Sequence, residues 1–149
     1  MKILILNGPN INFLGIREKE IYGKETYESM CNYILNTFEE TDVEIDILQS
    51  NIEGEMINIL QKAYFEKYDG IVINPGAYTH TSIALFDAIK SIEIPTVEVH
   101  LSNIHQREEF RHKSFTAPAC IGQICGFGKE GYILAVEGLI VHIKDKENF

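Results

Sequence analysis

The chain has 149 residues, of which 45% are hydrophobic and 23% charged, and its formal net charge is −9 at pH 7. This size and composition predict one globular domain, residues 1–149, with a single core. The acidic balance disfavours nucleic acid and anionic membranes as partners, because both attract clustered Lys and Arg. It leaves room for an anionic substrate that a few local arginines would hold.

Strands and helices are expected to alternate along the chain, because short apolar or alternating runs are separated by segments with apolar residues at helical spacing. The expected strands cover residues 2–7, 43–49, 70–74, 96–101 and 119–125. The expected helices cover residues 26–40, 53–68, 81–92 and 128–144. Such alternation implies right-handed crossovers. We therefore predict an α/β fold, a flavodoxin-like doubly wound sheet of five parallel strands.

The apolar run at the N-terminus is interrupted by Asn7, Gly8 and Pro9, so it is too short for a signal peptide. No other apolar run reaches the length of about 18 residues that a membrane span needs. The three cysteines are an odd number without C-x-x-C spacing, which is typical of small buried side chains rather than disulfides. We expect a cytoplasmic protein.

Polar residues end several of the predicted strands, at 7–10, 49–51, 74–76 and 98–103. In open parallel sheets, ligands bind outside the carboxyl ends of the strands. Ordinary loops are polar too, but the asparagines and the His-Ser-Asn pattern at these ends indicate a ligand site.

Glu98 and His100 share one face of a predicted strand, because side chains alternate with period two. A carboxylate beside an imidazole can orient it and hold its proton, although such a pair could also merely end a strand. His80 lies where a helix is expected to begin, and backbone donors there favour anionic or oxygen-rich ligands. Alternatively, Thr79 or Thr81 caps that helix and His80 has no role.

Four further residues could serve a site. Arg107 and Arg111 are four apart and would share a face if their segment is helical. Their guanidinium groups suit hydroxyls and carboxylates, but pairing with neighbouring glutamates on a solvated helix is equally consistent. The connection at 8–27, about twenty residues long, has the length of a lid or binding loop. It holds Arg17 and Tyr22, and it could also be a plain surface loop.

The sequence lacks the motifs that are typical of several other kinds of active or binding site. The chain has no G-x-x-x-x-G-K-[ST] phosphate loop and no G-x-S-x-G nucleophile elbow. The G-x-G-x-x-G match at 126–131 follows the last strand, outside the context of a dinucleotide site. His80, His100, His105 and His112 lack the spacing of a zincin helix and have no paired cysteines, so we expect no metal.

Several segments match one known family in the same order: LNGPNINFLG at 6–15, RE at 17–18, YG at 22–23, NPGAYTHTS at 74–82, DA at 87–88, EVHLSNIHQREEFR at 98–111, GFG at 126–128 and GY at 131–132. Spread over nearly the whole chain, they resemble the type II 3-dehydroquinate dehydratase family. The resemblance implies a lyase of the shikimate pathway, in aromatic amino acid biosynthesis, that works without cofactor or metal. The implied reaction is an anti elimination of water from 3-dehydroquinate, through an enolate, to 3-dehydroshikimate.

The resemblance also implies the residues that would carry the reaction. Tyr22 would be the base, with Arg17 favouring its phenolate. His100 would be the acid, oriented by Glu98. Asn10 would help to stabilise the enolate through a water molecule.

The substrate would be bound by two further groups of residues that the same motifs imply. The side chains of Asn74, His80 and Arg111 would hold ring hydroxyls. The backbone N–H groups of Leu101 and Ser102 would hold the carboxylate.

At the level of assembly, the resemblance implies a homododecamer built from trimers. Asp87 would reach the site of a neighbouring subunit, and Arg107 would be structural. Two other classes stay open: a flavodoxin-like module that binds flavin or nucleotide, and a relative that assembles or binds without catalysis. The lack of Trp and of a Ser/Thr-rich phosphate loop disfavours the first. Retention of Arg17, Tyr22 and His100 disfavours the second.

Overall fold

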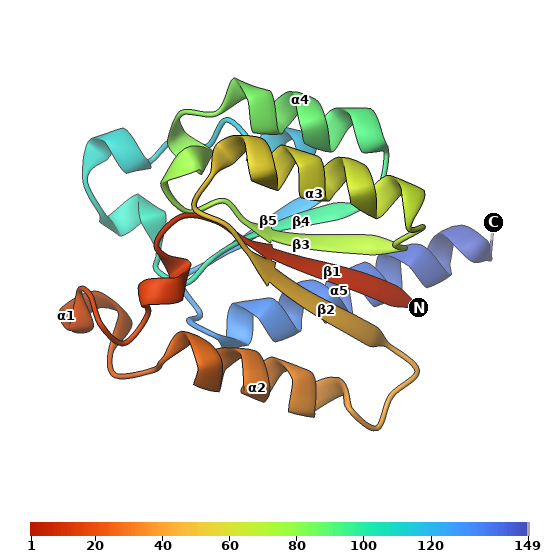
Figure 1. Ribbon diagram of the computed structural model, residues 1–149, viewed down its shortest axis with the longest axis horizontal. Coiled ribbons are helices and arrows are strands. Elements are labelled where there is room, and N and C mark those ends of the chain that lie inside the picture. The colour runs from red at the N-terminus through yellow and green to blue at the C-terminus, as the bar shows by residue number, and fades with distance from the viewer. Residues whose placement is uncertain (149) are drawn as a thin grey trace.

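A parallel sheet forms the centre of the molecule (Figure 1). The computed structural model describes residues 1–148, with Tyr22 described only along its backbone. The strands are β1 (Lys2–Asn7), β2 (Glu44–Gln49), β3 (Gly70–Asn74), β4 (Thr96–His100) and β5 (Gly122–Cys125). They are all parallel in the order β2-β1-β3-β4-β5. This is the flavodoxin-like order, so the predicted doubly wound fold is confirmed.

Helices cover both faces of the sheet. They are α1 (Lys19–Tyr22), α2 (Tyr27–Phe38), α3 (Glu53–Phe65), α4 (Ile83–Ile92) and α5 (Glu130–Glu147). In Figure 1, α3 and α4 lie over one face, while α2 and α5 lie over the other. The short α1 stands apart from both layers, within the long connection that follows β1.

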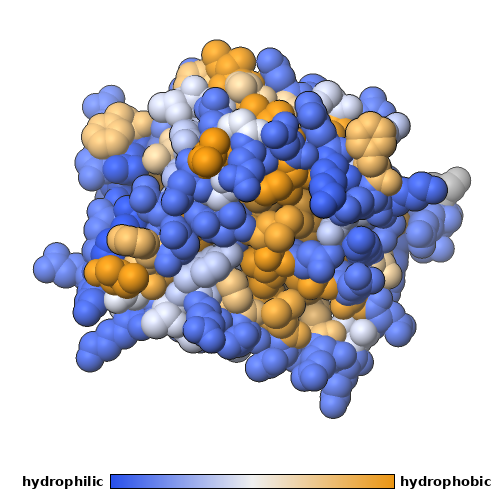
Figure 2. Space-filling model, viewed as in Figure 1, coloured by the Kyte–Doolittle hydropathy of each residue, from blue (hydrophilic) through white to orange (hydrophobic). Residues whose placement is uncertain are grey.

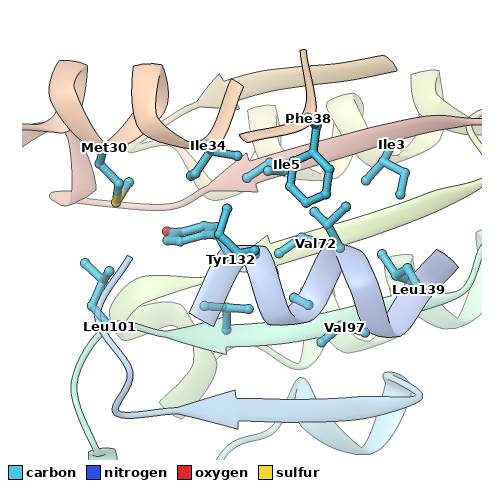
Figure 3. Packing of buried hydrophobic residues seen from close by; sticks show 14 of the residues in the cluster. Ile3, Ile5, Met30, Ile34, Phe38, Val72, Val97, Leu101, Tyr132 and Leu139 are labelled. Atoms are coloured by element: carbon cyan, nitrogen blue, oxygen red, sulfur yellow. The ribbon is translucent and has the colours of Figure 1, made fainter. Parts of the chain in front are cut away.

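The central strands are buried on both faces, which explains their continuous apolar sequences. On β1, Ile3 and Ile5 point into the layer formed by α2 and α5, whereas Leu4 and Leu6 point into the layer of α3 and α4. The first layer is seen in Figure 3, where Tyr132 of α5 lies between its own helix and the residues of α2. Because side chains pack on both faces of the sheet, the carboxyl ends of these strands are held in fixed positions. The pocket described below lies at those ends.

Some predicted boundaries differ from the structure. The last strand begins at Gly122 rather than at residue 119, because pairing with β4 begins at Val97 opposite Gly122. The helix expected from residue 81 begins at Ile83, since the hydroxyl of Ser82 accepts a hydrogen bond from the Leu85 N–H at 2.9 Å. This serine is the N-cap, so the suggested caps Thr79 and Thr81 are wrong.

The surface seen in Figure 2 is largely hydrophilic, with a hydrophobic band near its centre, where β2 forms an edge of the sheet. Within the described residues, no helix has the length and apolar character of a membrane span. The three cysteines are free thiols of intermediate burial.

Candidate active site

The carboxyl ends of β1, β3 and β4 surround a small pocket with a volume of about 160 Å³. It lies at the point where the connections from β1 and β3 leave toward opposite faces, as expected for an open parallel sheet. The pocket is lined by Pro9, Asn10, Ile11, Arg17, Asn74, Gly76, Ala77, His80, His100, Leu101, Ser102, Ile104, Arg107 and Arg111.

Most of the residues predicted for a site line this one pocket, although they come from distant parts of the chain. They are Asn10, Arg17, Asn74, His80, His100, Leu101, Ser102 and Arg111. Glu98 lies behind His100 and contacts it directly. Asp87 is exposed on α4 and is not among the lining residues. The side chain of Tyr22 lies outside the described part of the structure.

Two glycines allow the loops after β1 and β3 to touch. A Cβ on Gly8 would lie 2.5 Å from the carbonyl oxygen of Pro75. Gly76 has a φ of +59°, and a Cβ there would lie 2.9 Å from the carbonyl oxygen of Pro9. Any side chain would therefore push the loops apart, and at Gly76 it would also be strained. The Gly8 N–H donates to the Asn74 carbonyl at 2.7 Å, which joins the two strand ends.

Asn10 adopts a left-handed backbone conformation with a φ of 69°, which Asn tolerates better than most residues. Its N–H donates to Oδ1 of Asn51 at 3.0 Å. Gln49 at the end of β2 donates to the same oxygen from Nε2, also at 3.0 Å. The edge strand thus holds the loop that carries Asn10 against the pocket.

Glu98 and His100 form a buried pair, with exposed fractions of 0% and 6%. Nε2 of His100 lies 3.0 Å from Oε2 of Glu98. Burial acts to raise the pKa of Glu98, but hydrogen bonds and the charge of His100 outweigh it and lower that pKa overall. An ionised carboxylate only accepts, so we assign the proton of this bond to Nε2. That leaves Nδ1 as the ring nitrogen through which His100 can exchange a proton.

Further donors surround the Glu98 carboxylate, and the sequence reasoning missed all of them. Thr79 Oγ1 donates to Oε1 at 3.0 Å, Ser114 Oγ to Oε2 at 2.9 Å, and Gln123 Nε2 to Oε2 at 2.6 Å. The Thr116 hydroxyl also donates to Oε1. Gln123 lies opposite Glu98 in the register of β4 and β5, which the sequence alone does not reveal. The others come from turns without any periodic pattern.

His80 has a fixed tautomer. Nδ1 lies 2.8 Å from the Lys113 carbonyl, which can only accept, so Nδ1 carries the proton. Burial lowers the pKa of His80, and the Lys113 carbonyl only partly offsets this. The neutral ring therefore offers Nε2 as an acceptor. His80 ends a 3-10 turn at Gly76–His80, two residues before Ser82, the N-cap of α4, so it lies near the start of that helix as predicted.

Arginines bring positive charge to the pocket of an otherwise acidic protein. Arg17 Nη1 lies 3.2 Å from Oε2 of Glu18, and Arg107 Nη2 lies 3.9 Å from Oε1 of the same residue. Arg111 Nε lies 2.5 Å from Oε2 of Glu108. Arg107 and Arg111 do not share a helix, because Arg107 is extended and separates two 3-10 turns, so the condition for a shared helical face is not met. Both side chains nevertheless line the same pocket.

Asn74 is anchored from behind by a buried tyrosine. Its Nδ2 donates to Tyr132 Oη at 2.9 Å, and Tyr132 Oη donates to Asn7 Oδ1 at 2.6 Å. Oδ1 of Asn74 accepts the Gly76 N–H at 3.1 Å. These contacts set the direction in which the Asn74 amide faces. In the sequence, Tyr132 stands out only as part of the family motif GY at 131–132, which does not indicate this contact.

The histidines near the pocket were considered as metal ligands. Among the described residues, no group of three or more His, Cys, Asp or Glu side chains could hold a metal ion.

Residues 1–140 match the family described as dehydroquinase class II. A 3-dehydroquinate dehydratase of Clostridium perfringens strain 13 is 66% identical over 146 residues, covering 98% of this chain and 100% of the relative. A protein of the same name from Clostridium acetobutylicum is 68% identical over 139 residues, covering 93% and 96%.

Solved structures agree with these matches. The crystal structure of a type II dehydroquinase from Butyrivibrio crossotus superposes with a TM-score of 0.92 at 56% identity, covering 93% of this chain and 97% of that one. A second, from Propionibacterium acnes, has a TM-score of 0.88 at 38% identity, covering 93% and 94%. Fold and pocket define an α/β protein with a small-molecule site at the switch point of its sheet. The chain belongs to the class II dehydroquinase family.

Proposed function

We propose that this chain removes water from 3-dehydroquinate and releases 3-dehydroshikimate, by anti elimination through an enolate. The observation that carries the proposal is the pocket, where the buried Glu98–His100 pair lies beside an arginine-rich wall. Relatives named 3-dehydroquinate dehydratase, alike over nearly their whole length, support it. The reaction is a step of the shikimate pathway toward aromatic amino acids.

The substrate defines what a site must supply. It has a ketone, a hydroxyl on the carbon β to that ketone, and a carboxylate on the same carbon as the hydroxyl. A base must take the proton between ketone and leaving group, and an acid must protonate the departing hydroxyl. Donors or cations must steady the enolate and the carboxylate. No redox step enters this scheme.

Tyr22 is the proposed base, on the strength of the motif at 17–23. A free phenol has a pKa near 10, so only about one molecule in a thousand is ionised at pH 7. A neighbouring cation favours the phenolate, and Arg17, which lines the pocket, is the proposed source. The phenolate takes the carbon-bound proton and becomes a neutral phenol.

His100 is the proposed acid. The imidazolium gives its Nδ1 proton to the β-hydroxyl, which leaves as water, and the electron pair of the enolate forms the new double bond. The Nε2 bond to Glu98 supports this role, because it holds the ring in one orientation throughout the transfer. The base has gained one proton and the acid has lost one, so the total charge of the site is unchanged.

The remaining pocket residues are proposed to bind the substrate. Neutral His80 offers Nε2 to a ring hydroxyl, while Asn74 and Arg111 hold hydroxyls from other walls. Backbone N–H groups of Leu101 and Ser102 hold the carboxylate. Asn10 is proposed to steady the enolate through a water molecule.

We also propose a homododecamer built from trimers, in the cytoplasm, with Asp87 acting at a neighbouring subunit's site. Asp87 is exposed on α4 and does not line the pocket of its own chain, which supports a role across an interface.

The function is tested by adding 3-dehydroquinate and following the ultraviolet absorbance of the conjugated product. Absorbance should rise with the purified chain, and His100→Ala should lose most of kcat while still binding substrate. Absence of any rise with the wild-type chain would overturn the proposal.

A further inference from the structure

The Glu98 carboxylate lies in a closed cage of polar side chains. Besides Nε2 of His100, its oxygens contact the hydroxyls of Thr79, Ser114 and Thr116 and the amide of Gln123. We refer to these four neighbours as the Glu98 cage. Thr79 and Thr116 are fully buried, and none of the four residues lines the pocket.

The cage is closely packed, because its hydroxyl oxygens lie in contact with one another and two of its residues accept hydrogen bonds from the backbone. Thr79 Oγ1 lies 2.7 Å from Ser114 Oγ and 2.8 Å from Thr116 Oγ1. The Ala117 N–H donates to Ser114 Oγ at 2.9 Å, and the Phe115 N–H donates to the Thr79 carbonyl at 2.6 Å. The turn before β5 is thereby fastened to the turn after β3.

A carboxylate offers about four lone-pair positions, and five donors converge on this one. Its acceptor capacity is therefore saturated. Each donor also takes up part of the negative charge. A bare carboxylate in a buried site would hold the imidazolium proton very tightly, and a tightly held proton is a poor one to transfer.

We infer that Thr79, Ser114, Thr116 and Gln123 are positioning residues for the acid of the proposed reaction. They act through Glu98, which they hold in one place and whose charge they spread, so that His100 keeps a fixed orientation and releases its proton. The inference rests on the proposed function. It adds four side chains, from two turns and the edge strand, to the machinery behind the acid.

Other ionisable groups face the same pair and stay unchanged in the experiment below. His80 lies on the turn after β3, and Arg111 interacts with His80 electrostatically. On the β5 side lie the thiols of Cys120 and Cys125. Burial raises the pKa of both thiols, and the negative charge of Glu98 raises them further. Across the pocket lie Arg17 and Arg107. These groups provide a constant background against which the loss of one cage hydroxyl can be measured.

The test compares Thr116→Val with Thr96→Val. Both replace a buried threonine by an isosteric valine, but the Thr96 hydroxyl donates to the Ile94 carbonyl at 2.9 Å rather than to Glu98. We expect Thr116→Val to lower kcat about 10- to 100-fold, the range for one hydrogen bond to a charged group. KM should stay within about twofold of wild type, because no substrate contact is removed.

The pH profile separates this role from a purely structural one. Loss of a donor to Glu98 raises the proton affinity of the Glu98–His100 pair, whichever partner holds the proton. The alkaline limb of kcat should therefore move to higher pH in Thr116→Val and stay in place in Thr96→Val. Thr116→Ser keeps the hydroxyl, so its kcat and the pH of its alkaline limb should both match those of the wild type.

Gln123→Leu gives a second variant at an exposed position on the edge strand, where folding tolerates substitution. It should shift the limb in the same direction. Wild-type turnover of 3-dehydroquinate together with Thr116→Val and Gln123→Leu profiles that match Thr96→Val would overturn the inference alone. A wild-type chain that fails to turn the substrate over would overturn the proposed function and the inference with it.

Discussion

Two histidines line the pocket. Each is hydrogen-bonded through one ring nitrogen to a different kind of acceptor, and this gives the two rings different chemistry. His80 bonds to a backbone carbonyl through Nδ1, and burial lowers its pKa, so that it presents a neutral acceptor. His100 bonds to a carboxylate through Nε2. A carboxylate can stabilise an imidazolium ion, whereas a neutral carbonyl stabilises it much less. These different environments support the roles proposed for the two histidines, His100 as the acid and His80 as an acceptor for a ring hydroxyl.

Tyr22→Phe and Arg17→Ala test the base and its activator. Tyr22→Phe removes the phenol oxygen but keeps the ring, so kcat should fall by at least the ~10²–10⁴-fold that general base catalysis contributes. Arg17→Ala should also be severe, because the proposed phenolate loses its cation. The two residues act as one unit, so the double variant should be little worse than Tyr22→Phe alone.

Arg17→Lys refines that comparison, since it keeps the charge and loses the planar fork, and only partial recovery over Arg17→Ala is expected. All four variants are assayed at saturating substrate. Near-normal turnover in Tyr22→Phe would move the base to another group at the strand ends.

Glu98→Gln should change how stability depends on pH. The folded chain lowers the pKa of Glu98, so the unfolded chain takes up its proton first, near the ordinary value of about 4.3. The stabilisation is complete above that pH and is lost progressively as pH falls from there through the lower pKa of the folded state. The gap in urea midpoint between wild type and Glu98→Gln should therefore be larger at pH 7 than at pH 4.

The exposed Glu40→Gln provides a control that should show little gap at either pH. A gap for Glu98→Gln that does not change with pH would show that the ionised form gains no special stabilisation in the fold.

The bounds of a strand or helix can be predicted from the sequence where burial of its side chains alone decides them. β1 and β3 have the predicted bounds, because strands buried on both faces are continuous apolar runs between polar ends. The start of α4 was misjudged because side-chain capping by Ser82 decides it. The start of β5 was misjudged because pairing in space, which periodicity does not encode, decides it.

The same distinction holds for the site. Alternation along one strand predicts that Glu98 and His100 share a face, and they are in contact. The hydroxyls of Ser114 and Thr116 come from a turn with no period and meet Glu98 only because the chain folds back. No local pattern could have found them.

Tyr132→Phe tests how α5 supports the site. Tyr132 is fully buried, and its hydroxyl joins Asn7 to Asn74. Its removal leaves two buried amides short of a partner, which should cost about 1–3 kcal/mol of folding free energy. The freed Asn74 amide should also lose its fixed direction, so KM for 3-dehydroquinate should rise. Tyr33→Phe, which removes an exposed hydroxyl bonded to Glu130, is the matched control. Equal stability and KM in both variants would show that Asn74 is held without Tyr132.

The whole molecule combines a net charge of −9 with a pocket wall that carries Arg17, Arg107 and Arg111. The overall field repels an anionic substrate at long range, while the local guanidinium groups attract it at short range. The ion pairs with Glu18 and Glu108 hold these arginines in place. Affinity for a carboxylate therefore depends on the local groups rather than on the charge of the protein.

Subunit mixing tests the proposal that Asp87 acts at a neighbouring subunit's site. Asp87→Ala and Tyr22→Phe are each expected to be poorly active as pure assemblies. After the two are dissociated together and reassembled, a site with an intact Tyr22 can receive Asp87 from its neighbour. Random mixing of equal amounts should then restore activity at about a quarter of the sites. Light scattering before and after mixing establishes that the large assembly has re-formed.

Tyr22→Phe mixed with His100→Ala is the control for this experiment. Both residues are proposed to serve the site of their own chain, so no mixture of these two variants can assemble an intact site, and activity should stay low. Recovery only in the mixture with Asp87→Ala would assign the carboxylate to the neighbouring site, as we expect because Asp87 is exposed on α4 and does not line the pocket. Equal results in the two mixtures, or full activity of pure Asp87→Ala, would contradict a role across the interface and leave each pocket complete within one chain.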